Sequence, residues 1–455
     1  MPAPSAAGMG MGGFRRKTHF QSKKNKDFSM KKLFPRLSAL VTASAALCAA
    51  EALAADVGHL AAVSNVSFTQ NANQDVIVTY DLVNDGQPAF VTMDVLTNGV
   101  PLPVAAVQSL SGDVSTNLTH FIPDGTGKQI VWKARTDWKG NLTSNATVVV
   151  SAHYTNHLEG VYLRVDVTGG TTAEAWPIHF GSVDPDVSSR AFLQDEIWLK
   201  CVPAGTFLMG SPDDEPGRSI YPATDETRHA VALTRPFFIG VAPLTRKQWT
   251  NMGGTMGTDT DALLQGYETC PAGNLRYSYG SANTTRLDTM LGTLAVKTGL
   301  SGFALPTEAQ WEYACRADTQ GVWADGSPWD PGTTGSTPTV SENLSELGWY
   351  SDNSAVSETK VFHPVATKAP NAWGLYDFHG NVWEFVRDEY AAYPAASVTD
   401  PKNVPDEPVS SDVVIVRRGG SKDTNASACR AAVRNTGLTA YQTNEATGAR
   451  LALEF

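Results

Sequence analysis

Apolar and polar residues alternate in short runs between residues 56 and 158, the pattern of β-strands with one buried face. The runs are clearest at residues 76–82, 90–96, 129–134 and 146–150. Sequences rich in Asn, Asp, Gly and Pro separate them, as expected for turns. No helical period is visible. We therefore predict an immunoglobulin-like β-sandwich at 56–158, without catalytic residues and suited to a spacer or adhesion role.

The pattern becomes irregular after this region. Residues 159–189 are predicted to be a final strand and a linker, with Gly169-Gly170-Thr171-Thr172 as the flexible point. A second domain follows at 190–455, with short strands, long loops and few helices, so the whole chain is predicted to be α+β. One helix is predicted at 307–316, where Thr307 and Gln310 form a capping box. Weaker helices are predicted at 245–249 and 287–297.

The N-terminal residues 1–54 are typical of an export signal behind an upstream extension. Met30-Lys31-Lys32 begins a basic stretch, 37–50 is an apolar run, and Ala52-Leu53-Ala54 is a cleavage site of small residues. Met30 rather than Met1 is the expected start. The apolar run is short for a membrane-spanning helix, and an uncleaved anchor is the alternative. We predict an exported protein, periplasmic, secreted or at the cell surface, that contacts membranes only through this signal.

Charge and cysteine content narrow the class of partner and the compartment. The formal net charge is −11 although residues 1–54 are basic, so the rest of the chain is strongly acidic and nucleic acid is an unsuitable partner. Beyond the signal there are four cysteines, an even number that suits an oxidising compartment and allows three pairings. They are Cys201, Cys270, Cys315 and Cys429.

Five motifs occur in order over the second domain. They are residues 202–211 (VPAGTFLMGS), 305–313 (LPTEAQWEY), 371–385 (NAWGLYD followed by GNVWEF), 418–421 (RGGS), and the Arg-x-Ala-x-Arg of 430–434 with Gly448-Ala449-Arg450. Together they resemble the formylglycine-generating enzyme, or sulfatase-modifying factor, family. The resemblance implies a C-type-lectin-like fold for the second domain and does not cover the first.

The resemblance also implies structural calcium. Carried over by position, Asp377 and Glu384 would supply side-chain oxygens, and Gly380 and Val382 would supply carbonyl oxygens, the ligands that Ca²⁺ prefers. On spacing alone, a turn-capping Asp377 and a surface Glu384 are the alternative. A second calcium, implied less directly, would use Asn353 and Ser354.

Family enzymes oxidise a substrate cysteine at a copper ion held by two thiolates, soft ligands that suit Cu(I). The residue three positions after Ser421 is Thr424, and the residue eight positions after it is Cys429. Counted back from the Arg-x-Ala-x-Arg motif, Cys429 instead falls outside the copper pair. One thiolate cannot form the site, so copper binding and catalytic residues are not expected. The resemblance implies a Cys315–Cys429 disulfide, which leaves Cys201 with Cys270.

The sequence therefore favours an exported, non-catalytic binding module for a protein or glycan ligand. Its ligand face is predicted at 421–444, a stretch rich in small polar residues. The predicted contact residues are Ser421, Thr424, Arg430 and Arg434. An oxidase that modifies a cysteine in a sulfatase or another protein is one alternative. A lectin-like variable receptor or adhesin is another.

Overall fold

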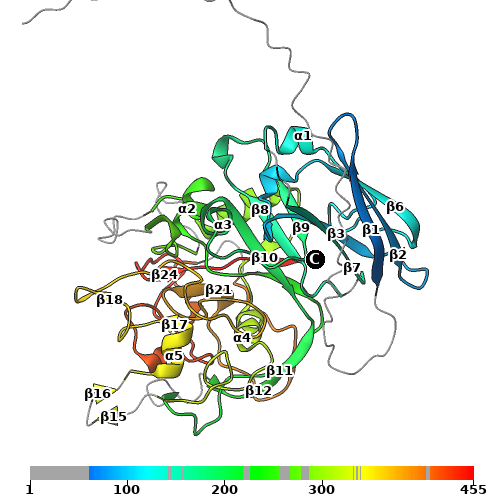
Figure 1. Ribbon diagram of the computed structural model, residues 1–455. Coiled ribbons are helices and arrows are strands. Elements are labelled where there is room, and N and C mark those ends of the chain that lie inside the picture. The colour runs from blue at the N-terminus through cyan, green and yellow to red at the C-terminus, as the bar shows by residue number, and fades with distance from the viewer. Residues whose placement is uncertain are drawn as a thin grey trace, which may run out of the picture. The chain divides into compact units, whose positions relative to one another are not determined.

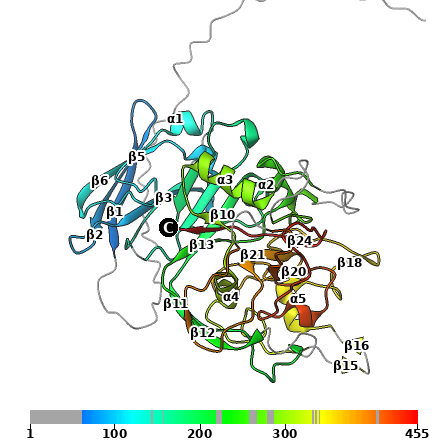
Figure 2. The same cartoon turned by 180° about the vertical axis from the view of Figure 1, so that it is seen from behind.

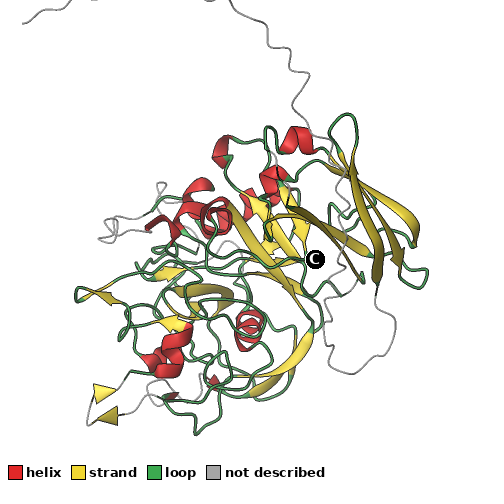
Figure 3. Ribbon diagram, in the orientation of Figure 1, coloured by secondary structure: helices red, strands yellow, loops and turns green. Residues whose placement is uncertain are grey.

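The computed structural model describes residues 61–455, except 142, 144, 156, 219–225, 257–266, 278–285, 331–332, 335–336, 339 and 406–409. The described residues belong to one compact unit. The predicted export signal lies outside them. Strands and loops dominate, with few helices (Figure 3), which confirms the α+β class. No helix in the described ranges is long and apolar enough to cross a bilayer.

Two antiparallel sheets form the N-terminal part. One has the order β1-β2-β6-β5 and the other β4-β3-β7. Their bounds are β1 Ala62–Gln70, β2 Val76–Val83, β3 Phe90–Thr97, β4 Val100–Pro101, β5 Leu110–Gly112, β6 Gly125–Trp132 and β7 Ala146–His153. Side chains of both sheets share one apolar core, including Val78, Met93 and Ile130. The four predicted strands are confirmed, whereas the immunoglobulin-like subtype stays a prediction.

A six-stranded sheet with the order β14-β25-β13-β10-β8-β9 lies at the centre of the second part (Figure 1). The strands are β8 Tyr162–Asp166, β9 Ile178–Gly181, β10 Glu196–Val202, β13 Phe237–Gly240, β14 Phe303–Ala304 and β25 Ala452–Glu454. One strand was predicted at 159–189, but the prediction of a linker there is wrong, because two strands of this range, β8 and β9, belong to this sheet. All five residues of β8 are buried, and the pattern of so short a strand does not show which sheet it joins.

Apolar clusters cover both faces of this sheet. Leu163, Leu199 and Phe238 point into one cluster, which also contains residues of α2 and α3. Tyr162, Trp198 and Ile239 point into another, which contains residues of α4. Figure 2 shows α2 and α3 together on one side of β10 and α4 on the other. The helices are α1 Ala134–Asp137, α2 Arg246–Asn251, α3 Leu287–Thr298, α4 Glu308–Arg316 and α5 Glu342–Leu347.

A buried ion pair attaches the first part to this sheet. The guanidinium of Arg164 on β8 lies 2.9 Å from the carboxylate of Glu196 on β10, and both side chains are almost fully buried. Glu196 also accepts a hydrogen bond from the backbone N–H of Val104 (2.6 Å), and Arg164 donates to the carbonyl of Leu102 (2.7 Å). Since both backbone groups belong to the first part, the two parts are joined by directional contacts.

Helix α4 has the predicted capping box, with Thr307 and Gln310 bonded reciprocally. Every residue of α4 is buried, including Glu308, Glu312 and Arg316. Helices α2 and α3 confirm the weaker predictions, and α2 also begins with a capping box.

The remaining strands are β11 Gly205–Met209, β12 His229–Leu233, β15 Thr333–Thr334, β16 Thr337–Pro338, β17 Gly348–Trp349, β18 Ala355–Val356, β19 Thr359–Lys360, β20 His379–Gly380, β21 Trp383–Glu389, β22 Val398–Thr399, β23 Ile415–Arg418 and β24 Thr447–Gly448.

Candidate functional site

Strand β23 ends at Arg418, and two glycines then turn the chain. Gly419 and Gly420 have φ values of 93° and 78°, a region that favours glycine. A Cβ on Gly420 would lie 2.4 Å from the sulfur of Cys429. The turn therefore brings the backbone directly against the last cysteine, and no larger residue fits there.

Thr424 and Cys429 meet behind this turn. The hydroxyl oxygen of Thr424 lies 3.5 Å from the sulfur of Cys429 and 3.0 Å from the carbonyl oxygen of Ser421, to which it donates. Cys429 ends a short 3-10 helix, Ala426–Cys429, which begins with the side-chain cap of Asn425. Thr424 and Cys429, three and eight residues after Ser421, are thus in contact. Of the two ways of locating the copper pair in the sequence, counting forward from the Gly-Gly-Ser motif therefore gives two residues that meet.

The chemistry of this pair does not fit a two-thiolate copper site, because one member is a hydroxyl. Cys429 is fully buried in an apolar cluster with Trp323 and Tyr350. Burial raises the pKa of its thiol to about 12. Unless a metal ion displaces the proton, the sulfur is therefore a neutral thiol at neutral pH.

His379 lies between Cys315 and Cys429. Its Nδ1–H donates to the carbonyl of Cys429 (2.7 Å), and its Nε2 accepts from the backbone N–H of Ala324 (2.9 Å). The sulfur of Cys315 is 4.0 Å from Nε2. Burial lowers the pKa of His379 to about 4, so the imidazole is neutral. It positions the backbone around Cys429.

The two predicted disulfides are not formed in this structure. None of the four described cysteines is in a disulfide, and all four are buried. They belong to four different apolar clusters, with Cys201 beside Leu199, Cys270 beside Phe362, Cys315 beside Trp311 and Cys429 beside Trp323. The family resemblance implied the Cys315–Cys429 pairing and left Cys201 with Cys270, but neither step used the geometry of this chain, in which each buried cysteine acts as a small apolar residue.

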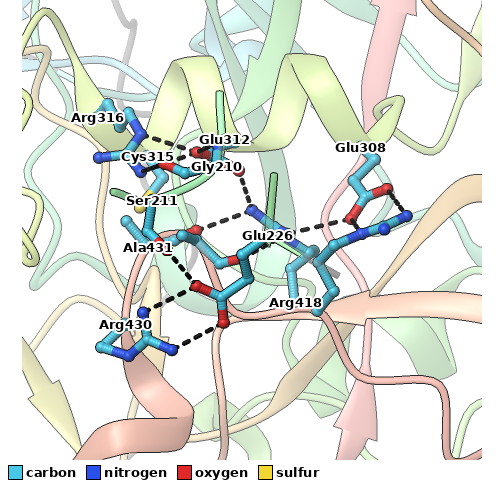
Figure 4. Close-up of polar contacts among 12 residues, drawn as sticks. Gly210, Ser211, Glu226, Glu308, Glu312, Cys315, Arg316, Arg418, Arg430 and Ala431 are labelled. Carbon is cyan, nitrogen blue, oxygen red and sulfur yellow. Dashed lines mark hydrogen bonds and ion pairs between the residues drawn. The ribbon is translucent and has the colours of Figure 1, made fainter. Parts of the chain in front are cut away.

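The prediction that Arg430 and Arg434 form a ligand face is wrong, because both are buried in ion pairs. Arg430 contacts both oxygens of Glu226 at 2.7 and 2.9 Å (Figure 4). It also donates to Glu215. Arg434 contacts both oxygens of Glu308 at 2.6 and 2.8 Å. Ser421 is also buried, and Thr424 is half-buried.

The same ion pairs connect the C-terminal loops to α4. Arg418 bridges Glu308 and Glu312, and Arg316 bonds Glu312 from the next turn of the helix (Figure 4). Burial acts to raise the pKa of Glu308, but the charges of Arg434 and Arg418 outweigh it and the net pKa is lowered. This network explains why α4 carries charged residues while being fully buried: each charge has a partner.

The residues predicted to hold calcium fit it only in part. Both oxygens of Glu384 bond Arg450 at 2.7 Å, and Oε2 also accepts from the indole N–H of Trp311. Gly380 places its carbonyl toward the N–H of Val382. Asp377 differs: its Oδ2 accepts from the N–H of Ala366 (2.6 Å), while its buried Oδ1 has no hydrogen-bond partner.

Burial raises the pKa of Asp377 to about 6. A buried carboxylate oxygen without a partner suits a cation ligand, so Asp377 fits and Glu384, already neutralised by Arg450, does not. No cluster of three or more His, Cys, Asp or Glu side chains suited to a metal occurs in the described ranges.

The second predicted calcium position is already used by protein groups. The amide oxygen of Asn353 accepts from the N–H of Tyr350 (2.8 Å), and the carbonyl of Ser354 contacts His363 (3.0 Å). The hydroxyl of Ser354 donates to the carbonyl of Lys422, whose buried ammonium donates to the carbonyl of Lys360 (3.2 Å). An internal lysine therefore supplies a cation in this region, and the prediction for Asn353 and Ser354 is not supported by their geometry.

Sequence reasoning missed two residues that organise the site. Asn371 donates to the carbonyls of Ala314 and Cys315 and accepts from two backbone N–H groups of its own turn. It thereby fixes the end of α4 to the 371–377 loop. Glu308 is the second, and the only available signal was its place at the start of a helix that also contains Glu312.

Residues 188–455 match the family described as the sulfatase-modifying factor enzyme 1-like domain. The formylglycine-generating enzyme of Streptomyces coelicolor is 27% identical over 269 residues, which cover 50% of this chain and 79% of that protein. A Bos taurus protein named inactive C-alpha-formylglycine-generating enzyme 2 is 26% identical over 231 residues, 42% of this chain and 70% of that protein. Against the formylglycine-generating enzymes of Mycobacterium tuberculosis and Bos taurus, the match spans only about a third of their length, 34% and 32%.

Two solved structures are similar over the same part of the chain. Treponema denticola variable protein 1 is 24% identical with a TM-score of 0.44, over 57% of this chain and 95% of that one. PvdO from Pseudomonas aeruginosa is 26% identical with a TM-score of 0.41, over 57% and 94%.

Proposed function

Since the chain belongs to the sulfatase-modifying factor enzyme 1-like family, we propose that it is an exported, non-catalytic binding protein of that family. Membership confirms the resemblance drawn from the motifs. It leaves open whether the chain keeps the oxidase activity of the named enzymes, and the residues at the copper position bear on that question.

The contact between Thr424 and Cys429 carries the proposal. A Cu(I) site at these two residues would need two thiolates, but Thr424 supplies a hydroxyl in place of one of them. The remaining thiol is buried, with its pKa raised to about 12 by desolvation. Without a second soft ligand, this pair has no means of holding the copper that activates O₂.

Two further features support the rest of the proposal. The basic, apolar and small-residue segments within residues 30–54 support export. The unpartnered oxygen of Asp377 supports one bound calcium with a structural role. The ligand is a protein or glycan, and it would contact surface other than the buried Arg430 and Arg434.

Copper titration and turnover test the proposal together. The purified chain is titrated with Cu(I) under a competing chelator, and a cysteine-containing peptide is then incubated with copper, reductant and O₂. We expect no stoichiometric Cu(I) binding and no conversion of the peptide cysteine to an aldehyde. One tightly bound Cu(I) per chain together with aldehyde formation would establish the oxidase alternative.

A further inference from the structure

Lys422 is a buried lysine in the turn that leads from the two glycines to Thr424 and Cys429. Only 4% of its surface is exposed. Its backbone N–H donates to the carbonyl of Asn381 (2.9 Å), and its carbonyl accepts from the hydroxyl of Ser354 (2.7 Å). Lysine is almost never buried to this extent unless its charge has partners, so the surroundings of the ammonium are informative.

Oxygen atoms from three parts of the chain surround this ammonium. It donates to the carbonyl of Lys360 (3.2 Å) and to both carboxylate oxygens of Asp423 (3.1 and 3.2 Å). The carboxylate of Glu445 lies 3.8 Å away, and the ring centroid of Phe362 lies 5.0 Å away. Two carboxylates converge on one ammonium, so this group of oxygens would repel itself without a cation among them.

Lys422 also holds both ends of a small exposed hairpin. Strands β18 and β19 have two residues each, and all of 355–360 is exposed. Ser354 directly precedes β18 and bonds the carbonyl of Lys422, while Lys360 ends β19 and accepts from its ammonium. A hairpin this short is marginal by itself. The lysine therefore fixes the base of the hairpin to the turn at 421–424.

The second calcium that the family resemblance implies would lie at the start of the same hairpin. The oxygens of Asn353 and Ser354 that it would need already accept from protein donors, including the N–H of Tyr350 and of Val361. Calcium prefers carboxylate and carbonyl oxygens, and these are the groups that surround the ammonium of Lys422. An ammonium has three donors and one positive charge, and being covalently attached it cannot dissociate.

We propose that Lys422 is a built-in replacement for the second calcium ion. Its ammonium holds the hairpin at 355–360 to the turn beside Thr424 and Cys429 without a metal. Its removal would leave the oxygens of Lys360, Asp423 and Glu445 around a position that a divalent cation would enter. This inference goes beyond the proposed function and holds whether or not the chain is an oxidase.

Thermal unfolding of the full chain in EDTA and in millimolar calcium tests the replacement. We expect Lys422→Met to melt on the order of 5 °C below the wild type in EDTA, because the two carboxylates then lack their ammonium. Calcium should recover about half of this difference or more, beyond any increase that it gives the wild type. Equilibrium dialysis should find one more calcium ion per variant chain than per wild-type chain.

Two matched variants separate the role of these oxygens from the loss of a positive charge. Lys422→Met combined with Asp423→Asn also removes a carboxylate ligand, so it should lose the additional calcium ion and the additional rise in melting temperature. Lys402→Met removes an exposed lysine and should match the wild type in both measurements.

An unchanged melting temperature for Lys422→Met in EDTA would show that the ammonium does not hold this region together. Equal calcium binding by Lys422→Met and the wild type, two tightly bound calcium ions in the wild type, or failure of the variant to fold even in calcium would each overturn the replacement. The copper and turnover assay decides the non-catalytic role independently, since it depends on Thr424 and Cys429 and not on Lys422.

Discussion

The hydroxyl of Thr424 and the sulfur of Cys429 lie in contact, five residues apart in the chain and 3.5 Å apart in space. The fold thus keeps two positions together although only one of them carries a sulfur. We expect that Thr424→Cys brings two thiols within reach of one Cu(I) ion, since thiolates are its preferred ligands. Titration against a competing chelator should give about one equivalent of Cu(I) per variant chain and none for the wild type.

The matched control is Thr424→Cys combined with Cys429→Ser, which restores one thiol and one hydroxyl in the reverse order. This double variant should bind as poorly as the wild type. Tight copper binding by the wild type, or none by the single variant, would contradict the interpretation that Thr424 and Cys429 form a potential copper site in which one thiolate is missing.

Arg434 is predicted to stabilise the fold rather than bind ligand. Arg434→Met leaves the buried Glu308 with Arg418 as its remaining described arginine partner, and removing one member of a buried pair costs about 3–5 kcal/mol. Urea unfolding should show the loss as a lower midpoint. Arg190→Met, which breaks an exposed pair with Asp195, should leave the midpoint unchanged. An unchanged midpoint for Arg434→Met would show that Arg434 does not stabilise the fold and would restore the prediction that it binds ligand.

Arg164 and Glu196 should couple the two parts of the chain. Arg164→Met leaves the buried carboxylate of Glu196 without its guanidinium, and we expect a loss of about 3–5 kcal/mol. Adding Glu196→Gln should recover part of this loss, because the amide still accepts from Val104 and carries no charge. Additive effects of the two substitutions in a double-mutant cycle would mean that the pair does not couple the parts.

Asp388 predicts a pH dependence of stability. Burial raises its pKa from 3.8 to about 6, so the folded chain holds a proton that the unfolded chain releases between these values. The contribution of Asp388 to the free energy of unfolding therefore falls by on the order of 2–3 kcal/mol as the pH rises from about 4 to 6. Asp388→Asn carries no titrating group, so the stability difference between wild type and variant should change by this amount over that range. A pH-independent difference would refute the assignment.

Calcium should stabilise the chain through Asp377. At 100 times its dissociation constant a ligand adds about 2.7 kcal/mol to the free energy of unfolding. We expect calcium, and not magnesium, to raise the melting temperature of the wild type, and Asp377→Ala to abolish the increase. The exposed Asp412→Asn serves as control. An equal calcium response in Asp377→Ala would place any site elsewhere.

Local features of the sequence predicted much of the architecture. The capping box at Thr307 correctly located the start of α4, because a side-chain cap depends on only four adjacent residues. Strands β2, β3 and β7 were found from alternation alone, since each is eight residues long. Family motifs likewise identified the part of the chain that the family match covers, residues 188–455.

The burial of charged residues, and their ion pairs with residues far away in the sequence, could not be predicted from local patterns. Arg430 meets Glu226 across 204 positions of sequence, so its polar surroundings suggested a surface when the partner lay in a distant loop. The family resemblance assigned Glu384 to calcium, and the sequence could not show that Arg450, 66 positions away, neutralises its charge. Only one strand was predicted where β8 and β9 lie, and it was not assigned to the second domain, because both strands are short and precede the recognised motifs.

Strands β8 and β9 have a consequence for any shortened version of this protein. They precede residue 188, where the family match begins, yet β8 supplies the hydrogen-bonding neighbour of β10 from Glu196 to Lys200. A fragment cut at the recognised boundary would leave that side of β10 with unsatisfied backbone amides and carbonyls on an apolar strand. Such an open edge invites copies of the fragment to join strand to strand, so polymeric, insoluble material is the expected product of an otherwise reasonable truncation.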